Sequence, residues 1–249
     1  MTKLSPPRVL GLLFLFLLTA QITTAQDVIH CWDFNTPTGT TGDEYPSPLN
    51  DANRAFGTGT ISHNFGPATE SFGGSSQNAC SGSIAGVAFA IEGGSGTSSV
   101  GGNNGKHLDF NFSSEGYENL ILSFWSRRTS TGFDNNQIQY STTGGNGPFI
   151  DLVGGNYNPV DLTAGQVETF NISNSLPQVN NEANLVIRII FDGASNASGN
   201  NYIDNVKLEG TPINNNDDDT VVIDPVTQIP TKTIVAADVT LPAQAKSIF

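Results

Sequence analysis

The chain has 249 residues, of which 23 are acidic and ten are basic, so its net charge at pH 7 is −13. An acidic surface repels phosphate backbones, which argues against nucleic acid as a partner. Charged residues make up only 13% of the chain and glycine is abundant, with 27 residues. This composition is typical of many short strands joined by polar turns.

The first 25 residues have the three parts of a secretory signal peptide. Lys3 and Arg8 give the positively charged first part, residues 9–20 are the apolar part, and Thr24-Ala25 ends a small-residue cleavage site. The apolar run is too short to span a membrane. We therefore expect a secreted, extracellular protein that begins at Gln26 and is not inserted in a membrane.

The mature chain opens with a predicted strand over residues 28–35, VIHCWDFN. Residues 36–105 are the least regular part. Glycine clusters such as 93–96 and 101–105 separate short apolar pieces, of which 87–91 is the clearest. Long loops with a few strands are expected in this half.

Regular alternation of apolar and polar residues begins at residue 106. Leu108, Phe110 and Phe112 recur at every second position, which indicates a strand with one apolar face. Similar patterns predict further strands over residues 120–127, 137–140, 167–172, 185–191 and 202–208, the last with a bulge near Asp204. Strands at this spacing predict an all-β fold, a jelly-roll β-sandwich over residues 26–211.

The composition changes after Gly210. An Asn-rich and acidic run over 214–219 is followed by a weakly apolar stretch that contains Pro225, Pro230 and Pro242. Residues 212–249 are therefore predicted to be a mostly unstructured linker or tail without a core of its own.

Cys31 and Cys80 are the only cysteines. In an oxidising compartment an even number of cysteines favours a disulfide, and two cysteines permit a single pairing. The alternative is a pair of buried free thiols.

No local catalytic motif is present. His30, His63 and His107 do not form an HExxH motif, and there is no GxSxG, Walker or zinc-type Cys/His pattern. We therefore expect a non-catalytic protein.

One strand carries a candidate ligand-binding face. Trp125 and Arg127 point away from the apolar face of residues 120–127. If Gln137, Gln139 or Arg188 of neighbouring strands lie on the same face, these residues could stack on and hydrogen-bond to a sugar. The alternative is that Trp125 packs in the core beneath a long loop.

Three segments in order resemble MAM domains. Residues 31–35, CWDFN, resemble their Cys-Asp-Phe-Glu opening, and 119–125, NLILSFW, resemble an internal Leu-Ser-Phe-Trp strand. Residues 201–208, NYIDNVKL, with 185–191 before them, resemble the final two strands and their Ile-Asp-Asp-Ile ending. Carbohydrate-binding jelly rolls share this pattern, as do modules at the front of exported bacterial hydrolases and nucleases.

The resemblance implies a structural calcium ion near the first and last strands, held by Asp33, Asn35 and Asp204. Asn35 stands where the family has Glu, and Asn205 replaces the second Asp of the closing motif. Amide oxygens bind calcium with less charge, so binding is expected to be weaker. The alternative is that Asp33 and Asp204 only cap turns.

These observations predict a non-catalytic binding or adhesion module that recognises a glycan or a protein at the cell surface. The alternative is an accessory domain at the front of a longer exported hydrolase or nuclease whose catalytic part lies downstream.

Overall fold

A computed structural model describes residues 26–35, 47–49, 54–66, 69–80, 82, 84–94, 102–159, 164–173, 176–213, 222–223 and 230–231. The side chains of 69–72, 222–223 and 230–231 are not part of this description. The predicted signal peptide, residues 1–25, and most of the predicted tail lie outside the described residues.

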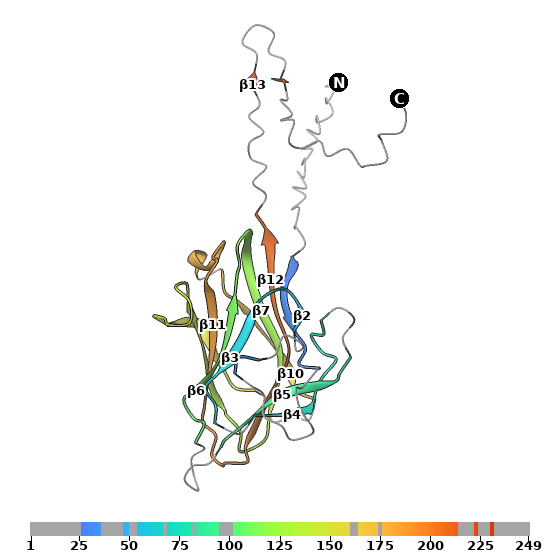
Figure 1. Ribbon diagram of the computed structural model, residues 1–249, viewed down its shortest axis with the longest axis vertical. Coiled ribbons are helices and arrows are strands. Elements are labelled where there is room, and N and C mark those ends of the chain that lie inside the picture. The colour runs from blue at the N-terminus through green and yellow to red at the C-terminus, as the bar shows by residue number, and fades with distance from the viewer. Residues whose placement is uncertain are drawn as a thin grey trace, which may run out of the picture.

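Two antiparallel sheets form the domain (Figure 1). In the larger sheet, β10 (Gln166–Asn171), β7 (Tyr117–Arg128) and β12 (Asn200–Pro212) are neighbours. One half of the long β12 then pairs with β1 (Asp27–Trp32), which is followed by β2 (Arg54–Phe56). The other half pairs with β5 (Val87–Glu92), which is followed by β4 (Thr69–Gly73).

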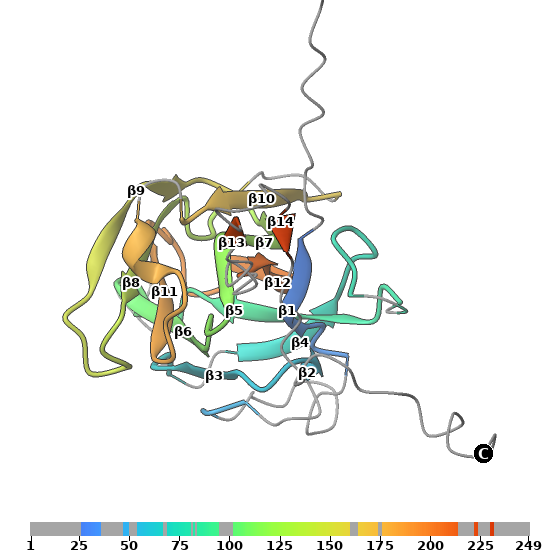
Figure 2. The ribbon, with the colours of Figure 1, turned by 90° about the horizontal axis from the view of Figure 1, so that it is seen from above.

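The smaller sheet has five strands, in the order β3 (Thr60–His63), β6 (Lys106–Phe112), β11 (Leu185–Asp192), β8 (Asn135–Ser141) and β9 (Ile150–Tyr157). Most consecutive strands lie in different sheets, so the chain crosses repeatedly between the two layers (Figure 2). The fold is therefore the predicted jelly-roll β-sandwich.

The core lies between the two sheets. Side chains on successive residues of a strand point to opposite faces, so every second residue enters the core. The predicted inward sets of β6, β7 and β11 are all buried in one cluster: Leu108, Phe110, Phe112, Leu120, Leu122, Phe124, Leu185, Ile187, Ile189 and Phe191.

The predicted bulge lies in the middle of β12. The register against β7 shifts between Asp204 and Lys207, and Asn205 adopts a left-handed backbone with φ of 51°. Asparagine tolerates this conformation better than most residues, since its short polar side chain can bond locally. The bulge turns Asp204 and Asn205 toward residues 74–80.

The predicted disulfide joins Cys31 of β1 to Cys80, with the two Cα atoms 6.0 Å apart. It fastens one end of the covering loop, which we define as residues 74–80, to the outer side of the larger sheet. Asn78 fastens the middle of this loop, because its amide donates to Ser123 Oγ at 3.1 Å and to the Asn205 carbonyl at 2.8 Å.

The start of β1 and the end of β12 lie at the same end of the sandwich (Figure 1), as their pairing of Asp27 with Gly210 requires. Beyond β12, the short strands β13 (Val222–Ile223) and β14 (Pro230–Thr231) pair with each other. Among the described residues, no helix is long and apolar enough to span a membrane.

Candidate functional site

The outer face of the five-stranded sheet carries a continuous row of polar residues. The register places five of them directly opposite one another on successive strands, in the order Ser62, Asp109, Arg188, Gln139 and Asp151. All five point away from the core, since their neighbours Ile61, Leu108, Ile187 and Ile138 are fully buried. We call this set the polar row.

Arg188 is held rigidly at the centre of the polar row. Its Nε and Nη2 atoms donate to the two carboxylate oxygens of Asp109 at 2.7 and 2.8 Å, a bidentate ion pair. The Arg188 guanidinium carbon also lies 3.5 Å from the ring centroid of Phe149, which comes from the loop between β8 and β9. Cation–π contact and bidentate pairing both restrict the side chain.

Two glutamines continue the face toward β9. Gln139 donates from Nε2 to Asp151 Oδ1 at 2.8 Å, and Gln137 donates to the Ile138 carbonyl at 2.7 Å. Both side chains are partly exposed. Because these hydrogen bonds fix both side chains, their remaining amide groups can bind a ligand in the positions that they already hold.

His107 adjoins the polar row. Its Nε2 atom lies 3.6 Å from Asp109 Oδ2. Burial lowers the pKa of His107, and the nearby Asp109 carboxylate only partly offsets that effect. His107 is therefore mainly neutral at pH 7, with one donor and one acceptor nitrogen.

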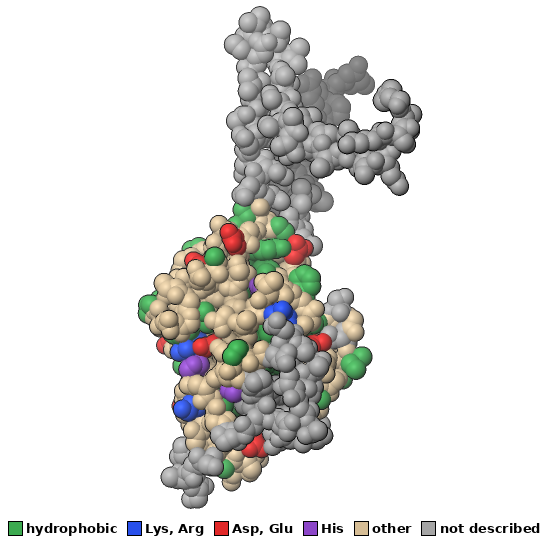
Figure 3. Space-filling model, in the orientation of Figure 1, with side chains coloured by type: hydrophobic (Ala, Val, Ile, Leu, Met, Phe, Trp, Pro, Cys, Tyr) green, Lys and Arg blue, Asp and Glu red, His purple; other side chains and the backbone are tan. Residues whose placement is uncertain are grey.

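A hollow lies at one end of the same face. It has a volume of about 270 Å³ and is lined by Asn111 and Val186 of the sheet, by Thr58 and Gly59, and by Gly144 of the β8–β9 loop. Figure 3 shows basic, acidic and histidine side chains close together on the flank where Figure 1 places β6 and β11. The face thus combines fixed polar groups with a shallow depression.

The predicted patch that joins Trp125 and Arg127 to these residues is wrong. Trp125 lies on β7, in the larger sheet, whereas Gln137, Gln139 and Arg188 lie on the outer face of the other sheet. The two groups are separated by the core. Residues two apart on one strand do share a face, but sequence alone did not assign the strands to sheets.

Trp125 is also buried, with 2% of its surface exposed. It packs with Ala88, Ala90 and Tyr202, and its Nε1 atom donates to the Ala164 carbonyl at 3.0 Å. Gly165 lies so close to the ring that an added Cβ would come within 2.5 Å of it. The alternative expectation, packing beneath a loop, describes Trp125 correctly.

Arg127 completes this second cluster. Its guanidinium carbon lies 4.2 Å from the Tyr202 ring centroid and 5.9 Å from that of Trp125. The pair of aromatic rings is thus occupied by a side chain of the same protein. The part of the outer face around Trp125 is therefore closed rather than open to a ligand.

Asp33 and Asp204, two of the predicted calcium ligands, lie near each other. Burial is the main cause that raises the pKa of Asp204 to about 7, and the neighbouring Asp33 carboxylate raises it further. Both Asp204 oxygens accept backbone N–H groups, Oδ2 from Ser75 at 2.8 Å and Oδ1 from Asn205 at 2.7 Å. Asp204 therefore does cap a turn, as the alternative interpretation held.

Asn35 lies beside the same loops. Its Oδ1 atom accepts the Val87 N–H at 3.0 Å and its own N–H donates to Asp33 Oδ1 at 3.4 Å. The neighbouring Asn205 has a buried Oδ1 atom with no hydrogen-bond partner. Among the described residues, however, no group of three or more His, Cys, Asp or Glu side chains is placed to hold a metal.

Sequence reasoning missed two residues of the open face, by which we mean the outer face of the five-stranded sheet. Asp109 alternates with Leu108 and Phe110, so its outward direction was readable, but its pairing with Arg188 depends on strand order. Phe149 follows Gly147-Pro148 in a loop, and no periodic signal marks it.

No family model matches this chain, and no curated protein matches it. The resemblance to MAM domains stays a prediction from the sequence.

Several solved β-domains are distantly similar in structure. The CBM22-1 xylan-binding domain of Xyn10C from Paenibacillus barcinonensis has a TM-score of 0.43 at 8% identity, covering 76% of this chain and 98% of that one. The K2 cleaved adhesin domain of Lys-gingipain has a TM-score of 0.44 at 10% identity, covering 72% and 96%. TmCBM61, solved with β-1,4-galactotriose, has a TM-score of 0.35 at 11% identity, covering 61% and 88%. These values assign neither a family nor a ligand.

Proposed function

We propose that the protein is a secreted, non-catalytic module that binds a neutral glycan on the outer face of the five-stranded sheet. The polar row carries this proposal. Its partly exposed Arg188 and Gln139 are each fixed by a carboxylate, from Asp109 and Asp151 respectively. Sugar hydroxyls are bound by planar polar side chains whose positions are set before the ligand arrives.

The charge of the site favours an uncharged ligand. Asp109 neutralises Arg188, so the face offers hydrogen bonds without a free cation at its centre. The chain as a whole has a net charge of −13, which repels acidic polysaccharides. Phe149 packs on Arg188 with one ring face but is partly exposed, so its remaining apolar surface can meet the C–H groups of a sugar ring.

The proposal is tested by affinity electrophoresis in gels that contain xylan, galactan, β-glucan, mannan or the acidic polysaccharide pectin. We expect one or more neutral polymers to retard the wild-type protein and pectin to have no effect. Gln139→Ala and Phe149→Ala should each weaken binding by about tenfold, which corresponds to roughly 1.4 kcal/mol. Thr169→Ala, an exposed change on β10 of the other sheet, is the control. Equal retardation of all four proteins, or no retardation by any polymer, would reject the proposed site.

We also propose that Asp33 and Asp204, with oxygens from Asn35 or Asn205, hold one calcium ion. Two neighbouring carboxylates match the charge of the ion, and amide oxygens are suitable further ligands. The unpartnered Asn205 Oδ1 atom supports the proposal. A bound ion would supply no chemistry other than holding β1, β12 and the covering loop together.

Calcium binding is tested by thermal unfolding of the wild-type protein in EDTA and after addition of excess calcium. An ion that binds only the folded state should raise the melting temperature. Asp204→Ala should abolish that increase, whereas Asp192→Ala, an exposed change in β11, should keep it. No response of the wild-type protein to calcium would mean that Asp33 and Asp204 serve as turn caps alone.

A further inference from the structure

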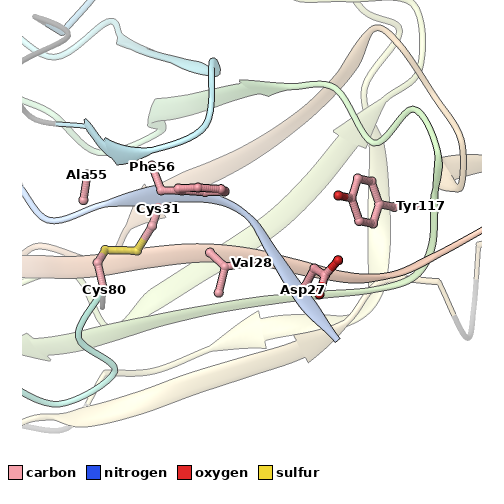
Figure 4. Close-up of a pocket in the computed structure, with 7 residues that line it drawn as sticks. All are labelled: Asp27, Val28, Cys31, Ala55, Phe56, Cys80 and Tyr117. Atoms are coloured by element: carbon pink, nitrogen blue, oxygen red, sulfur yellow. A yellow bond between two sulfur atoms is a disulfide. The ribbon is translucent and has the colours of Figure 1, made fainter. Parts of the chain in front are cut away.

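A pocket of about 410 Å³ lies beside the disulfide, on strands of the larger sheet, and none of its lining residues belongs to the Trp125 cluster. Phe56 of the edge strand β2 and Tyr117 at the start of β7 stand on two sides of it (Figure 4). Val28 lies between the two rings, the Cys31–Cys80 disulfide lines the end of the pocket near Phe56, and Asp27 lies toward Tyr117 at the other end (Figure 4).

Two apolar side chains that line the pocket are largely exposed to solvent. Phe56 is 56% exposed and Val28 is 37% exposed, although both belong to paired strands. Exposed apolar side chains that gather around a hollow, rather than lying singly, mark a place where another molecule binds. The disulfide and the β1–β2 pairing hold the walls in place without a ligand.

The charge of the pocket selects the ligand. Of the described residues that line it, Asp27 alone is charged, and the exposed Glu118 follows Tyr117 along β7. Aromatic faces and a carboxylate attract a cation, and the apolar walls suit an aliphatic stem. A sugar carries hydroxyl groups around its ring, and these would find few partners between Phe56 and Val28.

We infer that this pocket receives a single lysine or arginine side chain from an extended segment of a protein partner. The aliphatic stem lies between Phe56 and Tyr117, and the cationic head reaches Asp27. A basic partner also fits a chain whose net charge is −13. The inference is independent of glycan binding, since the polar row belongs to the other sheet.

The experiment is a titration of the ¹⁵N-labelled full mature chain with four acetylated and amidated pentapeptides. Each has the form Gly-Gly-X-Gly-Gly, in which X is lysine, arginine, norleucine or glutamate. We expect the lysine and arginine peptides to shift the backbone amide signals of Val28, Phe56 and Tyr117. The norleucine peptide should bind at least fivefold more weakly, and the glutamate peptide should cause no shift.

Three variants complete the test. Phe56→Ala should weaken binding of the lysine peptide at least tenfold, and Asp27→Asn should weaken it about fivefold and remove most of its salt dependence. Val153→Ala, a change at a 79% exposed apolar residue of β9 in the other sheet, should have no effect. Asp27→Asn changes no core contact, so it keeps the test valid if Phe56→Ala fails to fold.

Three results would overturn the inference. Equal binding of the norleucine and lysine peptides would make the pocket a purely apolar site. Shifts of the same amides by a neutral oligosaccharide, with none by the peptides, would make it a sugar subsite. No shift by any peptide at millimolar concentration would show that the pocket is not a binding site.

Discussion

The two outer faces of this sandwich arise from the same alternation of residues, yet they differ in exposure. On the seven-stranded sheet, Trp125 and Asp204 point outward but are 2% and 1% exposed. On the five-stranded sheet, Gln139 and Arg188 also point outward and remain partly exposed. Alternation with a period of two residues therefore identifies which side chains point away from the core, but it does not show whether they are exposed to solvent.

Segments distant in sequence cause the difference. The covering loop, residues 74–80, is bound to the larger sheet through the disulfide, through Asn78 and through Asn205, whose amide donates to the Ser75 and Gln77 carbonyls at 2.7 and 2.9 Å. Gln77 in turn donates to the Ala164 carbonyl at 3.1 Å, beside the segment that covers Trp125. Over the polar row, Phe149 of the β8–β9 loop packs on Arg188, yet Arg188 and Gln139 stay partly exposed.

The largest loss of stability is expected from a change on the outer face of the seven-stranded sheet, which the covering loop and residues 164–165 partly cover. Trp125→Ala removes a buried side chain and should lower the free energy of unfolding by about 3–5 kcal/mol. Urea unfolding followed by circular dichroism measures the change. Val167→Ala, the directly opposite and 38% exposed residue on β10, should cost less than about 1 kcal/mol. Similar costs for the two variants would mean that Trp125 is not covered in solution.

Removal of the disulfide tests how the covering loop is held. Cys31 and Cys80 are separated by 49 positions. A closed loop of that length stabilises the folded state by about 4 kcal/mol in the chain-entropy model. The Cys31→Ser/Cys80→Ser double variant should therefore unfold at lower urea concentration. Titration of the unfolded, unreduced wild-type protein should find no free thiol, and two free thiols would contradict the pairing.

The pH dependence of stability tests the burial of Asp204. Its folded-state pKa of about 7 exceeds the ordinary value of 3.8, so the unfolded chain loses its proton at lower pH than the folded chain. In EDTA, this stabilising contribution is complete below about pH 4 and is lost as the pH rises through about 7. The full change is at most about 4 kcal/mol, from about 1.4 kcal/mol per pKa unit. Asp204→Asn should flatten the profile between these values, and a wild-type profile that rises over the same range would contradict it.

Much of the fold could be read from local sequence. The apolar sets of 108–112 and 120–124 predicted strands and their inward faces, because alternation is a property of one strand. The disulfide followed from the cysteine count. The bulge at Asp204 was visible as a break in the alternation of 202–208, and the structure adds the positive φ of Asn205.

The open face could be predicted only in part. Gln137, Gln139 and Arg188 were identified as outward, polar residues, and the structure places them together on adjacent strands. Their assumed neighbour Trp125 belongs to the other sheet, because strand order is set by long-range packing that no local pattern encodes. Phe149 and the Phe56–Tyr117 pocket depend on loops and edge strands, where periodicity is absent.

Mapping of bound glycan by NMR tests the central claim most directly. The ¹⁵N-labelled chain from Gln26 onward is titrated with an oligosaccharide of whichever neutral polysaccharide retards it in the gels. If the open face binds glycan, the amide signals that shift will cluster at 107–111, 137–139, 149–151 and 186–190, on β6, β8, β9 and β11. Shifts confined to the covering loop, β10 or the β1–β2 edge, with these four segments unchanged, would contradict the account.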